Sequence, residues 1–322
     1  MTFYVIRRVL IGVLLLLFMS VAFFALTRVT PGPPFSTGEN PRAHQELIDR
    51  RMHNLGLDQP WYQQYPAYLN ALVHGSLGDS YVNDQPVSKL LMERVPNSIV
   101  LLGVSLLVSL LIAIPLGVFA ATHQYSKLDT TTSVLSYIGI SVPSFVLGVF
   151  LLLAGAVWLR HLTNGAIYFP LFGMHQSASN SGLDDLAWHM VLPVTSLSIL
   201  SIAGFSRFMR ASMLEVLHQD YVRTAKAKGL PARAVNYKHA LRNAILPIVT
   251  LVALQTPQFV SGAIITEGIF SWPGMGLLAF QAAVDRDYPV ILGVVMLVAA
   301  LTVLFNLLAD IAYAIVDPRI RY

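Results

Sequence analysis

The sequence predicts an all-α membrane protein with six transmembrane helices, a small extracytoplasmic helical region and a cytoplasmic helix-turn-helix. Of its 322 residues, 55% are hydrophobic and 12% are charged, whereas a soluble domain carries about 25% charged residues. Six segments are apolar enough to cross a bilayer, which requires roughly 20 residues. They are Val9–Thr27, Ile99–Ala121, Thr130–Leu159, His189–Ser206, Ala244–Thr266 and Pro289–Val316.

The first apolar segment has some features of a signal peptide. Arg7 and Arg8 precede it, and Ser20-Val21-Ala22 forms a weak cleavage site. Its length and the five spans that follow favour a retained first helix. We therefore divide the chain into an N-terminal segment with the first span (1–27), an extracytoplasmic helical region (28–98) and a five-helix core (99–322). The extracytoplasmic region is too short for a large core of its own, so we expect it to pack on the spans.

Basic residues predict the orientation of the spans. With both termini in the cytoplasm, the inner segments hold thirteen Lys and Arg against four acids, and the outer segments hold eight against twelve. Cytoplasmic loops of membrane proteins carry such an excess of bases. The opposite orientation would place the most basic loop outside. Because the bases lie in these loops, the net charge of +4 does not indicate a nucleic-acid partner.

The most informative stretch lies within the loop 207–245, between the fourth and fifth spans. Leu214, Leu217, Tyr221 and Ala225 recur at the spacing of one helix face. Gly229 is expected to end this helix. Pro231 then suits the first turn of a second helix, whose own apolar stripe is Tyr237, Ala240, Leu241 and Ala244.

This loop admits three interpretations. It is an ordinary basic cytoplasmic loop, a docking element for another protein, or a helix lying on the lipid surface. Apolar stripes exposed to water favour a protein partner. The small residues Ala225, Ala227 and Gly229 suit close protein packing better than insertion into lipid.

Five further positions are candidates for a translocation path or gate. Pro143, between Ser141 and Ser144, interrupts the third span. It is expected to kink the helix, while the serines bond the freed carbonyls. Such a kink is structural or supplies polar groups to a pathway.

Glu267, after the fifth span, is a gating or pairing residue or a solvated end. Asp310 is a charge inside the sixth span, and such charges are costly and often functional, although one near the inner end also fits contact with cytosol.

Several kinds of chemistry have no motif in the sequence. There is no G-x-x-x-x-G-K-[ST], no H-E-x-x-H and no G-x-S-x-G, and the chain has no cysteine. The nine histidines are scattered along the sequence. We therefore expect a conduit, not an enzyme, with no metal or cofactor in this chain and an energy source on another subunit.

Nine short motifs, spread over nearly the whole chain, carry a resemblance to a known family. They are YVIRR (4–8), PGPP (31–34), GSLGDS (75–80), ERVPNS (93–98), DYVRTAKAKGL (220–230), HALRNAILP (239–247), IFSWPGMG (269–276), RDYPV (286–290) and DPRIRY (317–322). Together and in this order, the chain resembles the inner-membrane permease subunits of bacterial ABC importers for dipeptides and oligopeptides, specifically the first of the two permeases. The resemblance implies the type I ABC importer permease fold.

In that family, an E-A-A-x-x-x-G signature in a cytoplasmic loop docks on the ATPase. Gly229 and Ala225 match the signature, whereas Arg223 stands where glutamate is usual and Thr224 replaces the first alanine. Arg242 stands where many importers have proline. The ATPase-coupling residues that the resemblance implies are Leu217, Asp220, Tyr221, Arg223, Thr224, Ala225, Lys226, Lys228, Gly229, Leu230, Leu241 and Arg242.

The resemblance also implies partners and a mechanism. A homologous second permease would share the translocation path, and two ATP-binding subunits would hold ATP and magnesium. An extracytoplasmic peptide-binding protein would deliver substrate to this bacterial plasma membrane complex, which would work by alternating access. The same machine carrying nickel chelates or other solutes is an alternative. A proton-driven secondary transporter is disfavoured because it would need several buried acids.

Overall fold

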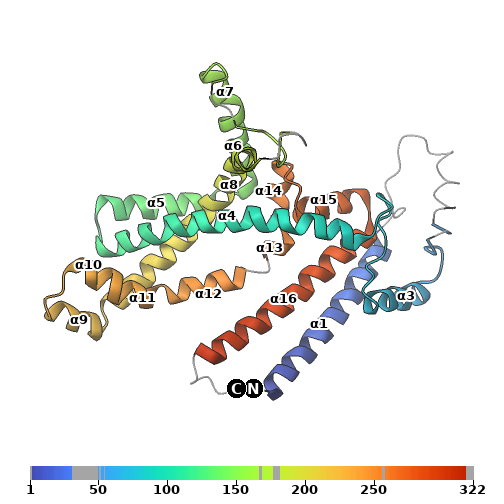
Figure 1. Ribbon diagram of the computed structural model, residues 1–322, viewed down its shortest axis with the longest axis horizontal. Helices are drawn as coiled ribbons and strands as arrows, with labels where there is room; N and C mark the ends of the chain where they lie inside the picture. Colours follow the sequence, from blue (N-terminus) through green and yellow to red (C-terminus); the bar gives the residue numbers. More distant parts are fainter. Residues whose placement is uncertain are drawn as a thin grey trace. The chain divides into compact units, whose positions relative to one another are not determined.

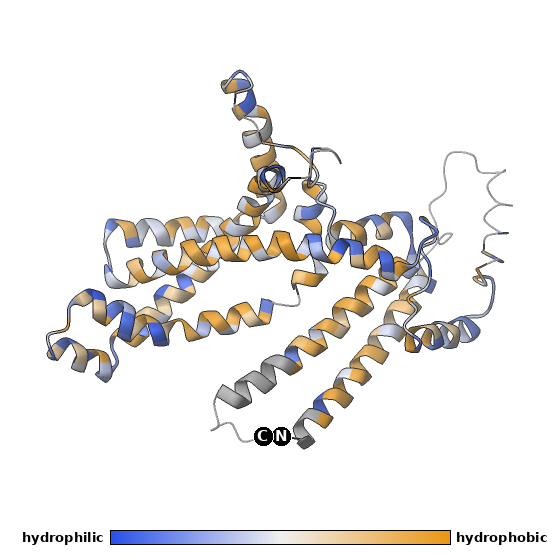
Figure 2. Ribbon diagram, viewed as in Figure 1, coloured by the Kyte–Doolittle hydropathy of each residue, from blue (hydrophilic) through white to orange (hydrophobic). Residues whose placement is uncertain are grey.

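The computed structural model describes residues 2–30, 50, 52–53, 55–166, 169–176, 182–255 and 258–316 (Figure 1). These residues are mostly helical, and an isolated bridge between Asp79 and Pro86 is the sole β-type pairing among them. Within the described ranges, five helical stretches are long and apolar enough to cross a membrane, or six if one bent pair counts as a single span. The predicted all-α, multi-span class is confirmed. Figure 2 shows long apolar stretches along α1 (Thr2–Val29) and α4 (Val87–Thr122).

The chain divides into two compact units. The first comprises Met1–Pro96 and Gly274–Tyr322. In it, α1 packs along α16 (Tyr288–Val316), and a Cβ added at Gly12 would come within 2.5 Å of Val303. The unit also contains α3 (Trp61–Val73), the start of α4 and α15 (Met275–Asp285). Of the predicted extracytoplasmic region, residues 31–49, 51 and 54 lie outside the described part of the chain.

The second unit is Asn97–Pro273 and contains the loop singled out from the sequence. Its long helices are the rest of α4 and α8 (Leu183–Leu217), with α5 (Lys127–Ser141) packed along α8. Gly117 lets α4 approach α8, because a Cβ there would lie 2.5 Å from the Met209 side chain. The core of the unit is formed by Val118, Met209, Met213 and Ile248 with their neighbours.

Two predicted spans are not continuous helices. The stretch 130–159 ends one helix at Ser141, and α6 (Ser144–Leu151) begins only after Pro143; the π-helix η1 (Leu152–Trp158) and α7 (Leu159–Leu162) follow. The cause is Pro143, which lacks an N–H and disfavours helical geometry in the residue before it. Its effect is a break and not the expected kink.

The stretch 244–266 is also divided. It comprises the end of α11 (Leu241–Ala244), then α12 (Leu246–Gln255), α13 (Gln258–Ser261) and the start of α14 (Ile264–Ile269). Gly262, between α13 and α14, has a φ of 75°, a conformation that favours glycine. The predicted fifth span is therefore built from several short helices.

Candidate functional site: the coupling hairpin

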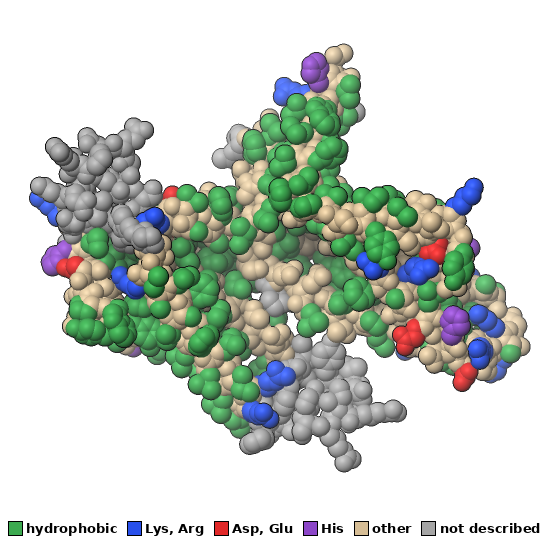
Figure 3. Space-filling view, turned by 180° about the vertical axis from the view of Figure 1, so that it is seen from behind, with side chains coloured by type: hydrophobic (Ala, Val, Ile, Leu, Met, Phe, Trp, Pro, Cys, Tyr) green, Lys and Arg blue, Asp and Glu red, His purple; other side chains and the backbone are tan. Residues whose placement is uncertain are grey.

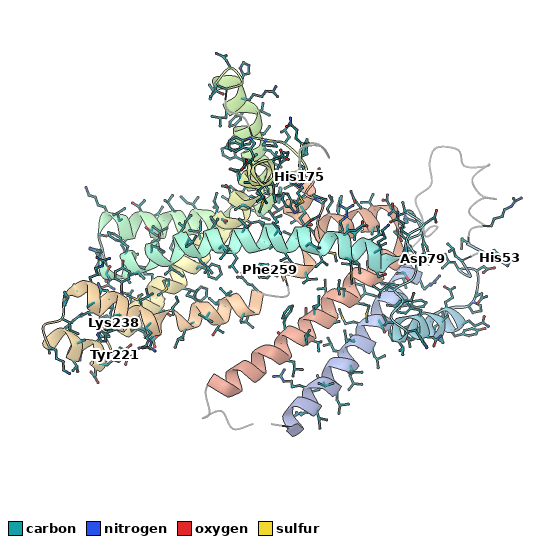
Figure 4. All side chains as sticks on the ribbon, in the orientation of Figure 1. His53, Asp79, His175, Tyr221, Lys238 and Phe259 are labelled. Carbon is teal, nitrogen blue, oxygen red and sulfur yellow. The ribbon has the colours of Figure 1, made fainter. Side chains whose placement is uncertain are left out.

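A helical hairpin, residues 220–244, follows α8 in the chain; we name it the coupling hairpin. It consists of α9 (Asp220–Ala227), α10 (Ala232–Ala234), the π-helix η2 (Val235–Ala240) and α11. Figure 4 labels Tyr221 on the first arm, α9, and Lys238 on the second arm, η2.

The predicted turn of the hairpin is confirmed. Gly229 has a φ of 74°, and its N–H donates to the Lys226 carbonyl at 3.0 Å. The Leu230 N–H donates to the Ala225 carbonyl at 3.4 Å, which satisfies a carbonyl at the end of α9. Pro231 immediately precedes α10 in an extended conformation, so it marks the start of the second arm.

Most residues of the two predicted apolar stripes are packed inside the chain, which corrects the expectation that the stripes are exposed to water; Tyr221 and Tyr237 are the exposed members. Val222 is fully buried and Ala225 is 6% exposed. The second arm covers them with Val235 and Ala240, in the same cluster as Met213 of α8. The two arms of the hairpin thus pack on each other and bury each other's apolar residues.

The predicted coupling residues therefore separate into two groups. The apolar positions Leu217 and Leu241 are partly buried against the core cluster, as Ala225 is buried within it. Tyr221 is 42% exposed, and its hydroxyl accepts a hydrogen bond from Asn243 Nδ2 at 2.8 Å. Leu230 is exposed beside the turn.

The outward surface of the hairpin is basic. Its exposed Lys and Arg side chains are Arg223, Lys226, Lys228, Arg233, Lys238 and Arg242. Figure 3 shows blue Lys and Arg side chains over this hairpin, with a few red acids among them. Arg223 and Asp220 lie 3.8 Å apart, and both are largely exposed, so this pair stabilises α9 little. The Thr224 hydroxyl donates to the Asp220 carbonyl at 2.9 Å within α9.

An ion pair joins the first turn of α5 to α8, the helix that leads into the hairpin. Arg210 donates to both carboxylate oxygens of Asp129, through Nε at 2.6 Å and Nη2 at 2.9 Å. Asp129 is 3% exposed and also accepts from the Tyr125 N–H at 3.0 Å. The hydrogen bonds from Arg210 are the main cause that lowers the pKa of the Asp129 carboxyl. Sequence analysis missed this pair because 81 positions separate its members and no motif joins them.

Glu267 is fully buried and holds a helix turn in place. Its carboxylate accepts from Ser98 Oγ at 2.8 Å and from the Ala263 N–H at 3.0 Å. Nearby, the fully buried Trp272 donates from Nε1 to the Asn97 carbonyl at 3.0 Å. The bond from Trp272 to Asn97 thus joins the motif IFSWPGMG to the motif ERVPNS. Of the readings given to Glu267, pairing is confirmed and a solvated end is wrong.

The remaining path candidates are placed as follows. Ser141 Oγ donates to the Tyr137 carbonyl at 2.8 Å, as expected for a serine beside a proline break. Pro143 is exposed and Ser144 partly buried, at the start of α6. Asp310 belongs to α16, but its side chain lies outside the described residues.

No group of three His, Asp or Glu side chains in the described part of the chain could hold a metal ion. Two histidines do contact one carboxylate: that of Asp185 lies 3.1 Å from His175 Nδ1 and 3.3 Å from His189 Nδ1. His189 Nδ1 is also 2.8 Å from the Asp185 carbonyl. The His175 contact brings the segment after α7 onto the start of α8, whereas Asp185 and His189 both belong to α8.

Helices long and apolar enough to cross a membrane, with a compact basic hairpin between them, fit the membrane transport component expected from the sequence. The family of binding-protein-dependent transport system inner membrane components matches residues 113–322, and the N-terminal region of such components matches residues 1–102. The chain belongs to this family, whose members are transport subunits and not enzymes.

Curated relatives match along the full chain. The chain is 40% identical to the oligopeptide transport system permease protein AppB of Bacillus subtilis, with all of both chains covered. It is 39% identical to OppB of Haemophilus influenzae, with 95% of each covered, and 37% identical to the dipeptide permease DppB of Escherichia coli, with 99% and 98% covered. The nickel alternative finds no support among them.

A solved structure shows the same fold. The inward-facing MetNI methionine ABC transporter matches with a TM-score of 0.55 at 17% identity, covering 71% of this chain and 97% of that one. At this identity the match concerns the fold alone. It agrees with the expected type I importer permease fold, and the family places the chain in the inner membrane as a multi-pass subunit.

Proposed function

We propose that this chain is one of two permease subunits of an ATP-driven importer of dipeptides and oligopeptides. The full-length relatives at 37–40% identity are named as peptide permeases, and this supports the cargo. A homologous second permease completes the path, and an extracytoplasmic binding protein delivers the peptide. The chain itself holds no cofactor, because ATP and magnesium belong to two partner ATPase subunits.

The coupling hairpin faces the cytoplasm in this proposal, as do both chain termini. Its six exposed bases are the densest group in the loops between spans, which fits the excess of Lys and Arg on the cytoplasmic side. The same bases offer charge-assisted hydrogen bonds to an ATPase groove. Arg223 takes the place of the family's glutamate, so this contact would differ in charge from that of other importers.

The observation that carries the coupling role is how α9 is anchored. Val222 and Ala225 lie in one core cluster with Val118 of α4, Met209 of α8 and Ile248 of α12. Because packed cores transmit displacement, an ATPase that moves α9 also moves three helices of the path. Closure of two ATPases on ATP would thereby drive the spans between inward-facing and outward-facing states.

Charge reversal on the exposed side of α9 tests the docking. Arg223→Glu combined with Lys226→Glu should remove the ATPase subunits from the purified complex, because both side chains are exposed and neither enters the core cluster. Lys127→Glu, an exposed reversal at the first residue of α5, is the control and should leave them bound. Full retention of a coupled complex by the double variant would refute the assignment.

Uptake assays test the cargo. Labelled dipeptides and oligopeptides should enter vesicles in an ATP-dependent manner when the binding protein is present. Uptake of nickel chelates alone would overturn the peptide assignment. Peptide uptake that persists without ATP would overturn the energy source.

A further inference from the structure

Two cavities lie one after the other along the α1 and α16 pair of the first unit. The first has a volume of about 410 Å³ and is lined by Arg28 and Thr27 near the end of α1 and by Tyr288 at the start of α16. The second, about 360 Å³, is lined by residues of the next turns, including Leu17, Met296 and Ala300. Leu77 lines both cavities, so they are neighbours.

The first cavity is lined by one basic and one acidic side chain, Arg28 and Asp79. Arg28 is held by a hydrogen bond to Gln64, and its guanidinium lies 5.2 Å from the centre of the Phe24 ring. A guanidinium has five N–H donors, so it keeps others for a ligand. Asp79 lines the same cavity and is exposed; Figure 4 labels it near the start of α4.

Two hydroxyls that line this cavity have no hydrogen-bond partner among the described residues. The hydroxyl oxygens of Tyr68 and Tyr288 are buried and unpaired. Burial raises the pKa of Tyr68 to about 12, so its hydroxyl stays protonated and can donate. Buried polar groups in native proteins are nearly always hydrogen-bonded, which indicates that a ligand with acceptor oxygens belongs here.

The second cavity differs in character. Its lining is aliphatic except for Ser20. The Ser20 hydroxyl donates to the Leu17 carbonyl at 2.7 Å and is hydrogen-bonded to the Tyr65 hydroxyl at 2.9 Å. The cavity thus offers an apolar surface and no free polar group, inside the membrane-crossing part of α1 and α16. A hydrocarbon chain suits it, and a peptide or an inorganic ion does not.

We propose that these two cavities hold one phospholipid molecule with an amine in its headgroup. An acyl chain occupies the apolar cavity. The phosphate oxygens accept hydrogen bonds from Arg28, Tyr68 and Tyr288, and the ammonium group lies toward the Asp79 carboxylate. The pairing of one base and one acid in the polar cavity matches the two charges of such a headgroup. The aromatic cluster of Phe24, Tyr65 and Tyr68 beside it is typical of a membrane interface.

Lipid analysis of the purified importer tests the proposal directly. After exhaustive detergent exchange, mass spectrometry of the wild-type complex should find about one phosphatidylethanolamine retained for each copy of this subunit. The delipidated complex should rebind phosphatidylethanolamine in preference to phosphatidylglycerol and to inorganic phosphate. Absence of stoichiometric lipid from the wild-type complex, or equal binding of both lipids, would overturn the proposal.

Matched variants separate the two cavities. Arg28→Gln, in the polar cavity, and Ala300→Phe, which fills the apolar one, should each lower lipid retention about tenfold. Arg28→Lys should retain most of it. Lys89→Gln and Leu304→Phe alter exposed side chains of the same unit outside both cavities and should change nothing. If only Arg28→Gln reduced binding, the ligand would be a soluble peptide or anion and the lipid assignment would fail.

Discussion

Two irregular segments of the second unit place their charges in opposite ways. The coupling hairpin turns its apolar residues inward and leaves six Lys and Arg side chains exposed. The turn 262–273 buries a carboxylate, Glu267, and an indole, Trp272, with no exposed area at either. The segment proposed to meet a partner keeps its charges outside, whereas the segment that fixes one helix to another buries its polar groups and bonds each of them.

The strength of the contacts differs accordingly. The hairpin's one exposed ion pair, Arg223 with Asp220, spans 3.8 Å in water, and such pairs contribute little. The buried groups of the turn, the Glu267 carboxylate and the Trp272 indole, make hydrogen bonds of 2.8–3.0 Å to Ser98 Oγ, the Ala263 N–H and the Asn97 carbonyl. We therefore expect mutations in the turn to reduce stability most, and exposed substitutions on the hairpin to affect assembly.

The largest expected effect follows removal of the buried indole. Trp272→Ala should lower the stability of the complex by about 3–5 kcal/mol, because it leaves a cavity and also deletes the hydrogen bond to the Asn97 carbonyl. The measurement is the thermal unfolding midpoint of the purified importer. Trp61→Ala, at a side chain that is 66% exposed, is the control and should cost less than about 0.5 kcal/mol. Equal shifts for the two variants would contradict the contrast drawn here.

A smaller effect is expected at the ion pair beside the hairpin. Asp129→Asn removes the charge that Arg210 binds through two hydrogen bonds and should cost about 2 kcal/mol. The pKa of Asp129 is lowered in the folded protein. Its contribution is therefore fully present above the unfolded pKa of about 3.9 and is lost as the pH falls through the folded pKa.

The pH dependence separates this ion pair from simple packing. The difference in unfolding midpoint between wild type and Asp129→Asn should be constant from pH 7 to about pH 5 and should shrink below about pH 4. A Gln substitution at Arg210 in the same background should add little, since its partner is already neutral. A difference that does not change down to pH 3 would show that the charge is not what stabilises this contact.

The sequence predicted what depends on local chemistry. The spans follow from apolar runs, and the end of α9 follows from Gly229, since glycine adopts positive φ at little cost. Pairings between distant segments could not be predicted. Asp129 and Arg210 lie on different helices, and the burial of Ala225 depends on Val235 and its neighbours in the other arm.

The broken spans show the same limit. Pro143 signals an interruption, but whether a helix kinks or ends there depends on the neighbours that pack around it. The division of 244–266 at Gly262 likewise depends on Glu267 and Trp272, whose partners in α4 lie more than 160 positions earlier. The sequence located Pro143 but gave no signal at Gly262, and in both cases tertiary packing decided the outcome.

The smallest expected effect concerns two glycines, Gly229 and Gly204. Both have room for a methyl group, but their backbone conformations differ. A Cβ at Gly229 or at Gly204 would meet no atom within 4 Å. Gly229 has a φ of 74°, so Gly229→Ala should cost about 1 kcal/mol through backbone strain alone. Gly204 lies inside α8, so Gly204→Ala should instead stabilise by about 0.5–1 kcal/mol. Thermal unfolding of the purified importer should therefore give shifts of opposite sign. Shifts of the same sign would mean that contacts with other subunits, and not backbone conformation, determine the effect of a methyl group at these positions.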